Sequence, residues 1–271
     1  MTWRPRSMRA GLIAALAIGY ACSEVSTNPN AVLSLELAPM QLPSIVLGDS
    51  IRDTTGAIDS LHAFAFNAQG NPVPTAPIRF FTISGRKLTK VDSISGQAVG
   101  LQTVDTLFDS LGNVRTIETA SRVIASVGVL QTVADTIFVV EFPDSLAPLD
   151  STLYALDYTR GQRDTLLPIR VRLLHLPFDS VPHYRLQYSY TYPLPHDNTD
   201  PAKVQLVNIA GLPQLIDTTQ VGGGLSTLSL HASFLTDTVT DSLGIDVSAF
   251  TPKHVPVHGS PLHFTILLHI H

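Results

Sequence analysis

Hydrophobic and polar residues alternate at every second position along most of this chain. In the segment 184–192, tyrosine and leucine occupy one set of positions and polar residues the other; in 262–270, large apolar residues alternate with mostly polar ones. An alternation of period two is typical of β-strands with one buried and one exposed face. No long stretch with the period of a helix follows the first 21 residues. The pattern therefore predicts an all-β fold.

Turn-forming residues separate the alternating segments at short intervals. The chain contains 19 prolines and 17 glycines. An aspartate followed by serine or threonine and an aliphatic residue also recurs, and such an aspartate can accept hydrogen bonds from nearby backbone amides and close a turn. The triplet begins at Asp49, Asp59, Asp92, Asp105, Asp109, Asp135, Asp144, Asp164, Asp179, Asp237 and Asp241. Short strands joined by frequent turns predict β-sandwich domains.

The strand-rich part of the chain divides into two blocks. Prolines interrupt the alternation at 142–150, so we predict a linker there, between a first β-sandwich at 31–141 and a second, divergent β-sandwich at 151–271. About 250 residues follow the first 21, which is enough for two domains of ordinary size.

One sequence element occurs in both blocks, at 72–80 and at 256–264. Both copies have Pro-Val, a second proline five positions after the first, and then an aliphatic residue two positions before a phenylalanine. This likeness indicates either a duplicated domain or one hairpin solution that was reached twice.

The first 21 residues have the organisation of a secretion signal. Arg4, Arg6 and Arg9 precede an apolar run at 11–21, which is shorter than the roughly 18–20 residues needed to span a bilayer. Cys22 follows directly, and this order resembles a bacterial lipoprotein signal, whose cysteine is lipidated and becomes the mature N-terminus. The resemblance implies an exported protein held to a membrane by a lipid on Cys22, with 22–30 as its tether.

The residues around the cleavage site leave two processing routes open. Gly19, Tyr20 and Ala21 also resemble the small-x-small site of the ordinary signal peptidase, which would cut at the same place. Where lipoproteins are sorted by the residue after the cysteine, Ser23 implies the outer membrane, with the domains facing the periplasm or the cell surface. Cys22 is the only cysteine, so no internal disulfide can form.

Charge and composition exclude several classes of partner. Without the three arginines of the first 21 residues, the formal charge falls from −5 to −8, from 14 basic and 22 acidic residues. An acidic surface argues against nucleic-acid binding and against attraction to anionic lipid headgroups. With 44% hydrophobic and 14% charged residues, the chain is expected to fold.

Several elements of the first block follow one another in the order found in bacterial immunoglobulin-like domains. They are an opening strand with a closing proline at 33–39, a Gly-Asp-Ser turn at 48–50, a strand with a glycine turn and a Pro-Val step at 61–73, a core strand at 78–81, a late strand at 121–126 and a closing strand at 137–140. The block resembles this family, which occurs in adhesins and surface lipoproteins, and the resemblance implies an immunoglobulin-like sandwich with a binding role. Two features differ: Phe80 or Phe81 stands where a core tryptophan is common, and 88–117 is longer than the family needs.

The Gly-Asp-Ser sequence is also similar to the nucleophile block of a family of serine hydrolases. A catalytic Ser50 would need a histidine base, usually oriented by an aspartate, and oxyanion donors. The only Asp-x-x-His sequence joins Asp59 to His62, in the next predicted strand, and no helices follow. We therefore predict a turn at 49–50, no enzymatic activity and no cofactor.

Histidines are concentrated in the second block, which holds nine of the ten. His263, His269 and His271 fall on one face of the last predicted strand, and imidazoles two residues apart in a strand can share a metal. A closed site needs three or four converging ligands, and histidines on the solvent side of a strand are the commoner arrangement. We predict no metal, with these three histidines as the candidates if one binds.

The tyrosines of 184–192 have two interpretations. Tyr184, Tyr188, Tyr190 and Tyr192 share one face of a strand. An exposed row of rings would be a candidate ligand-binding surface for carbohydrate, whereas apolar residues on one face of a central strand usually form the core. Exposure of the rings distinguishes the two.

The sequence thus predicts an exported, non-catalytic cell-envelope lipoprotein that acts as a binding, adhesion or structural module. Its partner would be a protein or a carbohydrate, contacted through loops or open strand edges. A carbohydrate-binding accessory protein that uses 184–192 is the alternative.

Overall fold

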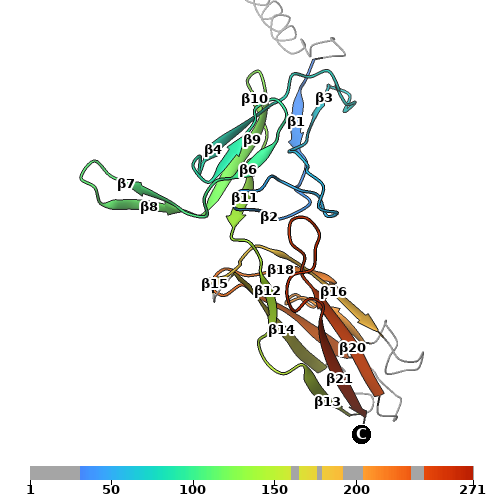
Figure 1. Ribbon diagram of the computed structural model, residues 1–271. Coiled ribbons are helices and arrows are strands. Elements are labelled where there is room, and N and C mark those ends of the chain that lie inside the picture. The colour runs from blue at the N-terminus through green and yellow to red at the C-terminus, as the bar shows by residue number, and fades with distance from the viewer. Residues whose placement is uncertain (1–30, 160–164, 176–178, 192–203, 233–240, 271) are drawn as a thin grey trace, which may run out of the picture.

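The computed structural model describes residues 31–159, 165–175, 179–191, 204–232 and 241–270 (Figure 1). These ranges consist of strands, turns and loops and contain no helix, which confirms the predicted all-β fold. None of the described elements is therefore a helix long and apolar enough to cross a membrane. The predicted signal and tether with Cys22, and also Tyr192 and His271, lie outside the described residues.

Eleven strands belong to the first block. They are β1 (Ser34–Leu37), β2 (Ser44–Val46), β3 (Ala63–Phe66), β4 (Arg79–Ser84), β5 (Thr89–Val91), β6 (Ala98–Gly100), β7 (Asp105–Phe108), β8 (Val114–Glu118), β9 (Ala120–Val127), β10 (Leu130–Gln131) and β11 (Asp135–Val140). One sheet has the order β10-β9-β11-β2, with β4 also paired to β9. Three two-stranded sheets, β1-β3, β5-β6 and β7-β8, complete the block.

The core of the first block lies between the five-stranded sheet and the smaller β1-β3 and β5-β6 sheets. Phe80, Val123 and Ile137 are buried there, and Leu35 and Leu37 of β1 pack against them. Of the two phenylalanines that could replace a core tryptophan, Phe80 is the buried one, while Phe81 is 46% exposed.

In the part of the second block that the structure describes, ten strands form two five-stranded sheets. They are β12 (Ser145–Pro148), β13 (Leu153–Tyr158), β14 (Thr165–His175), β15 (Asp179–Ser180), β16 (Arg185–Thr191), β17 (Val204–Val207), β18 (Ile216–Thr218), β19 (Leu225–Ala232), β20 (Asp241–Ser248) and β21 (Leu262–Ile270). One sheet is β12-β14-β19-β17 with β15 beside β14, and the other is β13-β21-β20-β16-β18. All pairs are antiparallel except β13 with β21, which is parallel.

The alternating apolar and polar residues predicted for these strands lie on the inner and outer faces of the sandwich, respectively. In β21, Phe264, Ile266 and Leu268 are fully buried, and the residues between them are at least partly exposed. Their buried cluster also contains Ile169 and Val171 from the facing sheet. Apolar inner faces from two sheets thus form one core.

The two blocks share part of this second core at a contact that we call the joint. Val46 of β2 and Val140 of β11 belong to the same buried cluster as the second block, and Phe138 packs against it. The ring of Phe138 stacks on the ring of His183, with centroids 3.5 Å apart. The predicted linker 142–150 contains β12, which pairs with β14, so the chain enters the sheet of the second block within that segment.

One five-residue turn recurs at five places among the described residues of the two blocks. In each turn the backbone N–H of the first residue donates to the carbonyl of the fifth, and the N–H of the fourth donates to the carbonyl of the first. The first side chain accepts a hydrogen bond from the fifth N–H. The turns are 53–57, 67–71, 109–113, 208–212 and 251–255. The fourth residue has a positive φ and is glycine in four turns, but it is His254, with φ 58°, in the last.

These turns explain the element that occurs in both blocks. The turn before each copy ends in an isolated bridge, between Phe66 and Pro72 and between Phe250 and Pro256. A third turn of the same kind is closed by the bridge between Val207 and Pro213. The hairpin closed by Val207 and Pro213 occurs without the rest of the element that 72–80 and 256–264 share. The likeness of those two segments is therefore better explained by a local hairpin structure that recurs than by a duplicated domain.

Candidate functional site

The tyrosines of β16 lie in or against the core of the second block. Tyr188 is buried, and its Oη lies 2.6 Å from Ser226 Oγ. Tyr184 and Tyr190 are partly buried and pack against the same core. These three tyrosines therefore do not form an exposed row of rings, and their positions favour the core interpretation.

The candidate metal-binding histidines are separated along the outer face of β21. His263 Nδ1 lies 2.7 Å from Asp246 Oδ1, and His269 Nδ1 lies 3.4 Å from Asp157 Oδ1. Each is thus paired with the carboxylate of a neighbouring strand. Among the residues that the structure describes, no group of three or more His, Cys, Asp or Glu side chains is placed to hold a metal ion.

The Gly-Asp-Ser segment forms a turn that an arginine holds closed. Asp49 accepts hydrogen bonds from Ser50 N and from Arg52 Nε and Nη2, at 2.8 to 2.9 Å. Burial acts to raise the pKa of Asp49, but these hydrogen bonds and the charge of Arg52 outweigh it, so the pKa is lowered. His62 pairs with Asp59 at 3.0 Å, and within the described ranges no histidine bonds to Ser50. The geometry is that of a structural turn.

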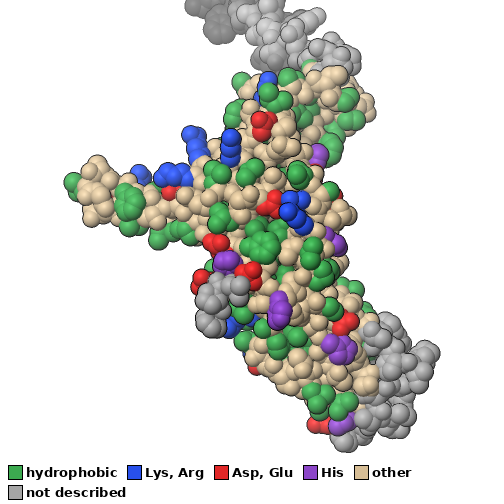
Figure 2. All heavy atoms as spheres, in the orientation of Figure 1, with side chains coloured by type: hydrophobic (Ala, Val, Ile, Leu, Met, Phe, Trp, Pro, Cys, Tyr) green, Lys and Arg blue, Asp and Glu red, His purple; other side chains and the backbone are tan. Residues whose placement is uncertain are grey.

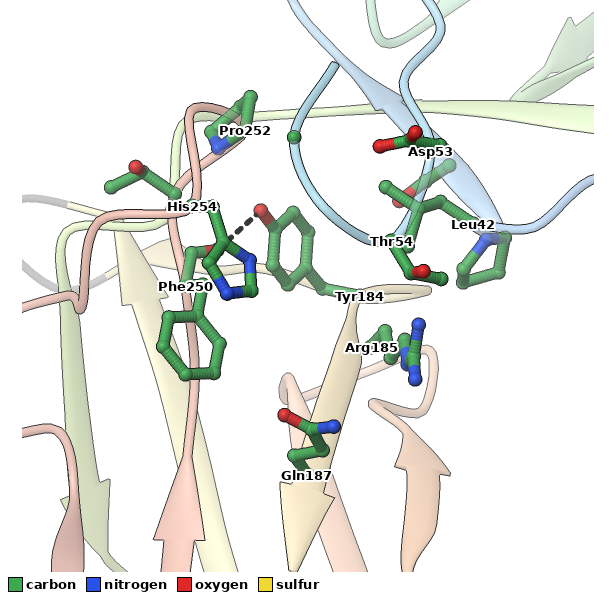
Figure 3. Close-up of a pocket in the computed structure, with 13 residues that line it drawn as sticks. Leu42, Asp53, Thr54, Tyr184, Arg185, Gln187, Phe250, Pro252 and His254 are labelled. Atoms are coloured by element: carbon green, nitrogen blue, oxygen red, sulfur yellow. Dashed lines mark hydrogen bonds between the residues drawn. The ribbon is translucent and has the colours of Figure 1, made fainter. Parts of the chain in front are cut away.

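A cleft with a volume of about 150 Å³ lies at the joint (Figure 3). The first block contributes Leu42, Pro43, Ser44, Asp53, Thr54 and Gly56 to its lining, and the second contributes Tyr184, Arg185, Gln187, Phe250, Thr251, Pro252 and His254. Ligand pockets usually have volumes of roughly 300–1,000 Å³, so this cleft is small for a whole ligand.

Two of the recurring turns meet at the cleft. A Cβ on Gly56 would lie only 3.0 Å from both His254 Cβ and Pro252 O, so the first turn packs closely on the last. The ring of His254 stacks on the ring of Phe250 (Figure 3), and the two ring centroids are 4.5 Å apart. Tyr184 Oη donates to Phe250 O at 2.6 Å, and burial, with the charge of Asp49, raises the pKa of Tyr184. The close approach of Gly56 fixes one block against the other here, and the contacts of Tyr184 and His254 with Phe250 fix the second block's side of the cleft.

A group of exposed apolar side chains lies on the β7-β8 hairpin, which we call the arm (residues 104–118). Figure 1 shows the arm projecting from the side of the first block. Five large apolar side chains on it are between 48% and 84% exposed: Val104, Phe108, Leu111, Val114 and Ile117. Single exposed apolar residues are ordinary, but a contiguous group on a projecting element is typical of an interaction site.

The register of the hairpin places four of these five side chains on one face, and Leu111 lies in the turn at the tip. Phe108 pairs with Val114, and Thr106 pairs with Ile117. Because directly paired residues in a β-hairpin point to the same side, as do alternate residues along a strand, Val104 shares this face. Figure 2 shows hydrophobic side chains along one side of the arm and at its tip, and Lys and Arg side chains on the other side toward its root.

Polar contacts fix the arm at both ends. At the root, Lys87 Nζ lies 3.1 Å from the buried Asp105 carboxylate, and Gly85 N donates to Glu118 at 2.8 Å. At the tip, Asp109 accepts hydrogen bonds from the N–H groups of Leu111 and Asn113, and these bonds lower its pKa. The arm is therefore preorganised.

Neither the arm nor the cleft was predicted as a site from the sequence. The available signal for the arm was the excess length of 88–117 over the immunoglobulin-like pattern. The cleft gave no signal, because its lining comes from short segments that are far apart in the chain.

No protein-family model matches this sequence, and no curated protein matches it. Solved structures that are similar to the chain include the Yersinia pseudotuberculosis adhesin InvE, with a TM-score of 0.36 and 15% identity over 87% of this chain. The chain spans 58% of that InvE chain. Domains 5–6 of the S-layer protein SbsC match with a TM-score of 0.28 and 10% identity, over 89% of this chain and 98% of theirs. Mouse cadherin-23 EC22–24 matches with a TM-score of 0.23 and 10% identity, over 89% of this chain and 65% of its own.

Proposed function

We propose that this chain is a non-catalytic binding or adhesion module of a bacterial cell envelope, exported and attached to the outer membrane by a lipid on Cys22. Its first block is an immunoglobulin-like domain, and the arm is the element that contacts a partner protein. The apolar face of the arm is the observation that carries the proposal.

The energetics of the arm support a role in binding. Burying one leucine or phenylalanine side chain contributes about 1.5–3 kcal/mol, so a partner that covers Phe108 and Leu111 gains a large part of the free energy of a specific contact. A two-stranded hairpin is only marginally stable by itself. The contacts of Asp105 and Glu118 hold this one in place, which lowers the entropy lost on binding.

The chemistry of the described residues supports a non-catalytic role. Ser50, the only nucleophile that the sequence singled out, lies in a turn closed by Asp49 and Arg52. The carbohydrate alternative has less support, because Tyr184, Tyr188 and Tyr190 pack in or against the core.

Intact mass and detergent partitioning test the anchor. The wild-type chain and Cys22→Ala would be expressed from the full sequence in a bacterial host. We expect diacylglycerol mass on the wild type and its partitioning into detergent, with neither in the variant. A lipid-free wild-type protein that begins at Cys22 would contradict the anchor and indicate simple secretion.

Binding to isolated envelopes from the source cells tests the arm. Labelled Cys22→Ala protein is expected to bind with saturation, and the additional changes Phe108→Ser and Leu111→Ser are expected to remove that binding. Ile209→Ser is the matched control, because Ile209 is at least as exposed as Leu111 but lies on the second block. Equal binding by the arm variant and the control would contradict the proposed role of the arm.

A further inference from the structure

The apolar face of the arm has the shape and chemistry to pack against a copy of itself. It is a two-stranded ribbon with Phe108, Val114 and Ile117 on one side. Two such ribbons can stack face to face at about 10 Å, in the way that two sheets of a sandwich do. A two-fold contact uses the same patch on both molecules, so it needs no second surface.

Charge distinguishes the two ends of the arm. Asp109 is the only charged residue between 106 and 114, and the exposed Arg115 follows beside the pair of Phe108 with Val114. A negative charge therefore lies at the end of the arm and a positive charge behind it. Arg86 and Arg122 lie exposed near the root, next to Gly85 and paired with Ser84, respectively. In an antiparallel pair of arms, the negative end of each copy approaches the basic root of the other. Opposite charges at the two ends therefore favour the antiparallel arrangement over the parallel one.

A membrane surface fits the arm less well than a protein does. Inserting Phe108 and Leu111 into the hydrocarbon of a membrane would carry the carboxylate of Asp109, which lies between them, out of water.

We propose that the arms of two copies of this chain pack together through their apolar faces, antiparallel and related by a two-fold axis. This inference rests on the proposed function, because it names the partner of the same binding element. The contact joins two anchored copies side by side on one membrane or links copies from opposing surfaces.

Sedimentation of the full chain with Cys22→Ala tests the inference, since this change removes both the lipid and the thiol as sources of association. We expect a reversible monomer–dimer equilibrium. Phe108→Ser is expected to raise the dissociation constant at least tenfold, a change typical of a central contact residue. Ile209→Ser is expected to leave it unchanged.

A second variant tests the antiparallel arrangement. Asp109→Asn keeps the turn, because asparagine accepts the same backbone hydrogen bonds and is the first residue in two of the other turns of this kind. We expect it to weaken the dimer several-fold and to reduce the salt dependence of association. Unchanged salt dependence would overturn the antiparallel pairing.

Three results would overturn the inference. The first is a single species of monomer mass up to about 100 μM, a concentration well above that of a micromolar complex. The second is dimerisation that Phe108→Ser leaves intact. The third is flotation of the monomer with phosphatidylethanolamine–phosphatidylglycerol vesicles that depends on Phe108. Arm-dependent binding to envelopes by a protein that stays monomeric would leave the proposed function standing while removing the second copy as its partner. Dimerisation of a protein that neither binds envelopes nor carries a lipid would support the second copy as the partner of the arm and contradict the proposed function.

Discussion

At the scale of single residues, the five-residue turn differs between its copies at the fourth position, which has a positive φ. Four of its five copies have glycine at the left-handed fourth position, and the fifth has His254. A non-glycine residue with positive φ is strained and persists where its surroundings hold it. His254 is held by its stacking on Phe250 and by the close approach of Gly56 from the other block.

Replacing Gly56 with alanine is expected to destabilise the protein more than replacing Gly70. Both glycines have the same place in the turn and a positive φ, so both changes carry a backbone cost of about 1–2 kcal/mol. Only at Gly56 would the new Cβ meet the other block, at 3.0 Å from His254 and Pro252, which adds about 1–3 kcal/mol of overpacking. Urea unfolding followed by circular dichroism measures the difference, and equal effects would show that the turns do not press on each other.

A buried hydroxyl network gives a second prediction at this scale. Tyr188 Oη lies 2.6 Å from Ser226 Oγ, which in turn donates to Asp217 Oδ2 at 2.5 Å. Since Ser226 uses its proton on Asp217, Tyr188→Phe removes the donor to Ser226 and is expected to lower the free energy of unfolding by about 1–2 kcal/mol. In a double-mutant cycle with Ser226→Ala the effects should not be additive. Additive losses would mean that the two hydroxyls act independently.

At the scale of strands and hairpins, the sequence predicted what depends on local alternation. The buried positions of β16 and β21 follow the apolar positions of 184–192 and 262–270, because a strand in a sandwich has one face in the core. Alternation carries no information on pairing partners, so the parallel pair of β13 with β21 and the strand β12 inside the predicted linker were missed. The arm follows the same alternation, but within the described residues no second layer covers its apolar face. No local sequence pattern shows that such a layer is missing.

Two phenylalanines on different strands separate core from contact surface. Phe264 is fully buried in β21, and Phe264→Ala is expected to cost about 3–5 kcal/mol of unfolding free energy. Phe108 is 61% exposed in the arm, and Phe108→Ala is expected to change stability by about 0.5 kcal/mol or less. Thermal or urea unfolding of both variants tests this, and a large loss from Phe108→Ala would show that the arm packs on its own chain.

At the scale of the whole molecule, the joint links the blocks through a shared core. Val46, Phe138 and Val140 of the first block pack with the core of the second, and the turns around Gly56 and His254 meet beside them. Apolar packing and ring stacking at the same contact favour two blocks that move as one body. The direction in which the arm points is then fixed relative to the second block as well as the first.

The joint is expected to weaken in acid because of His183. Its ring is stacked on Phe138, and burial lowers its pKa below the usual 6.5. The folded state therefore favours the neutral ring, so this stabilisation is complete above pH 6.5 and is lost as the pH falls through the lowered pKa. Stability measured from about pH 8 to about pH 5 should fall less steeply in His183→Asn, since asparagine tolerates the positive φ of this position.

His175 provides the control for this pH dependence. Its hydrogen bond to Phe142 O and the nearby charge of Asp144 raise its pKa, so its contribution is present below pH 6.5 and is lost as the pH rises. His175→Gln should therefore steepen the loss of stability in acid, while His183→Asn should reduce it. A pH profile that both variants shift in the same direction would contradict the assignment.

The parallel pairing of β13 with β21 sets an order of events for the making of this protein. Leu153 pairs with Thr265, and β13 has no other partner strand among the described residues, so β13 remains without a neighbour until more than a hundred further residues have been delivered. The pairings of the first block are complete by Val140. In a chain that emerges N-terminus first from a ribosome or a translocation channel, the first block can therefore fold early, whereas the second waits for β21. This delay leaves the second block exposed to proteases and chaperones for longest.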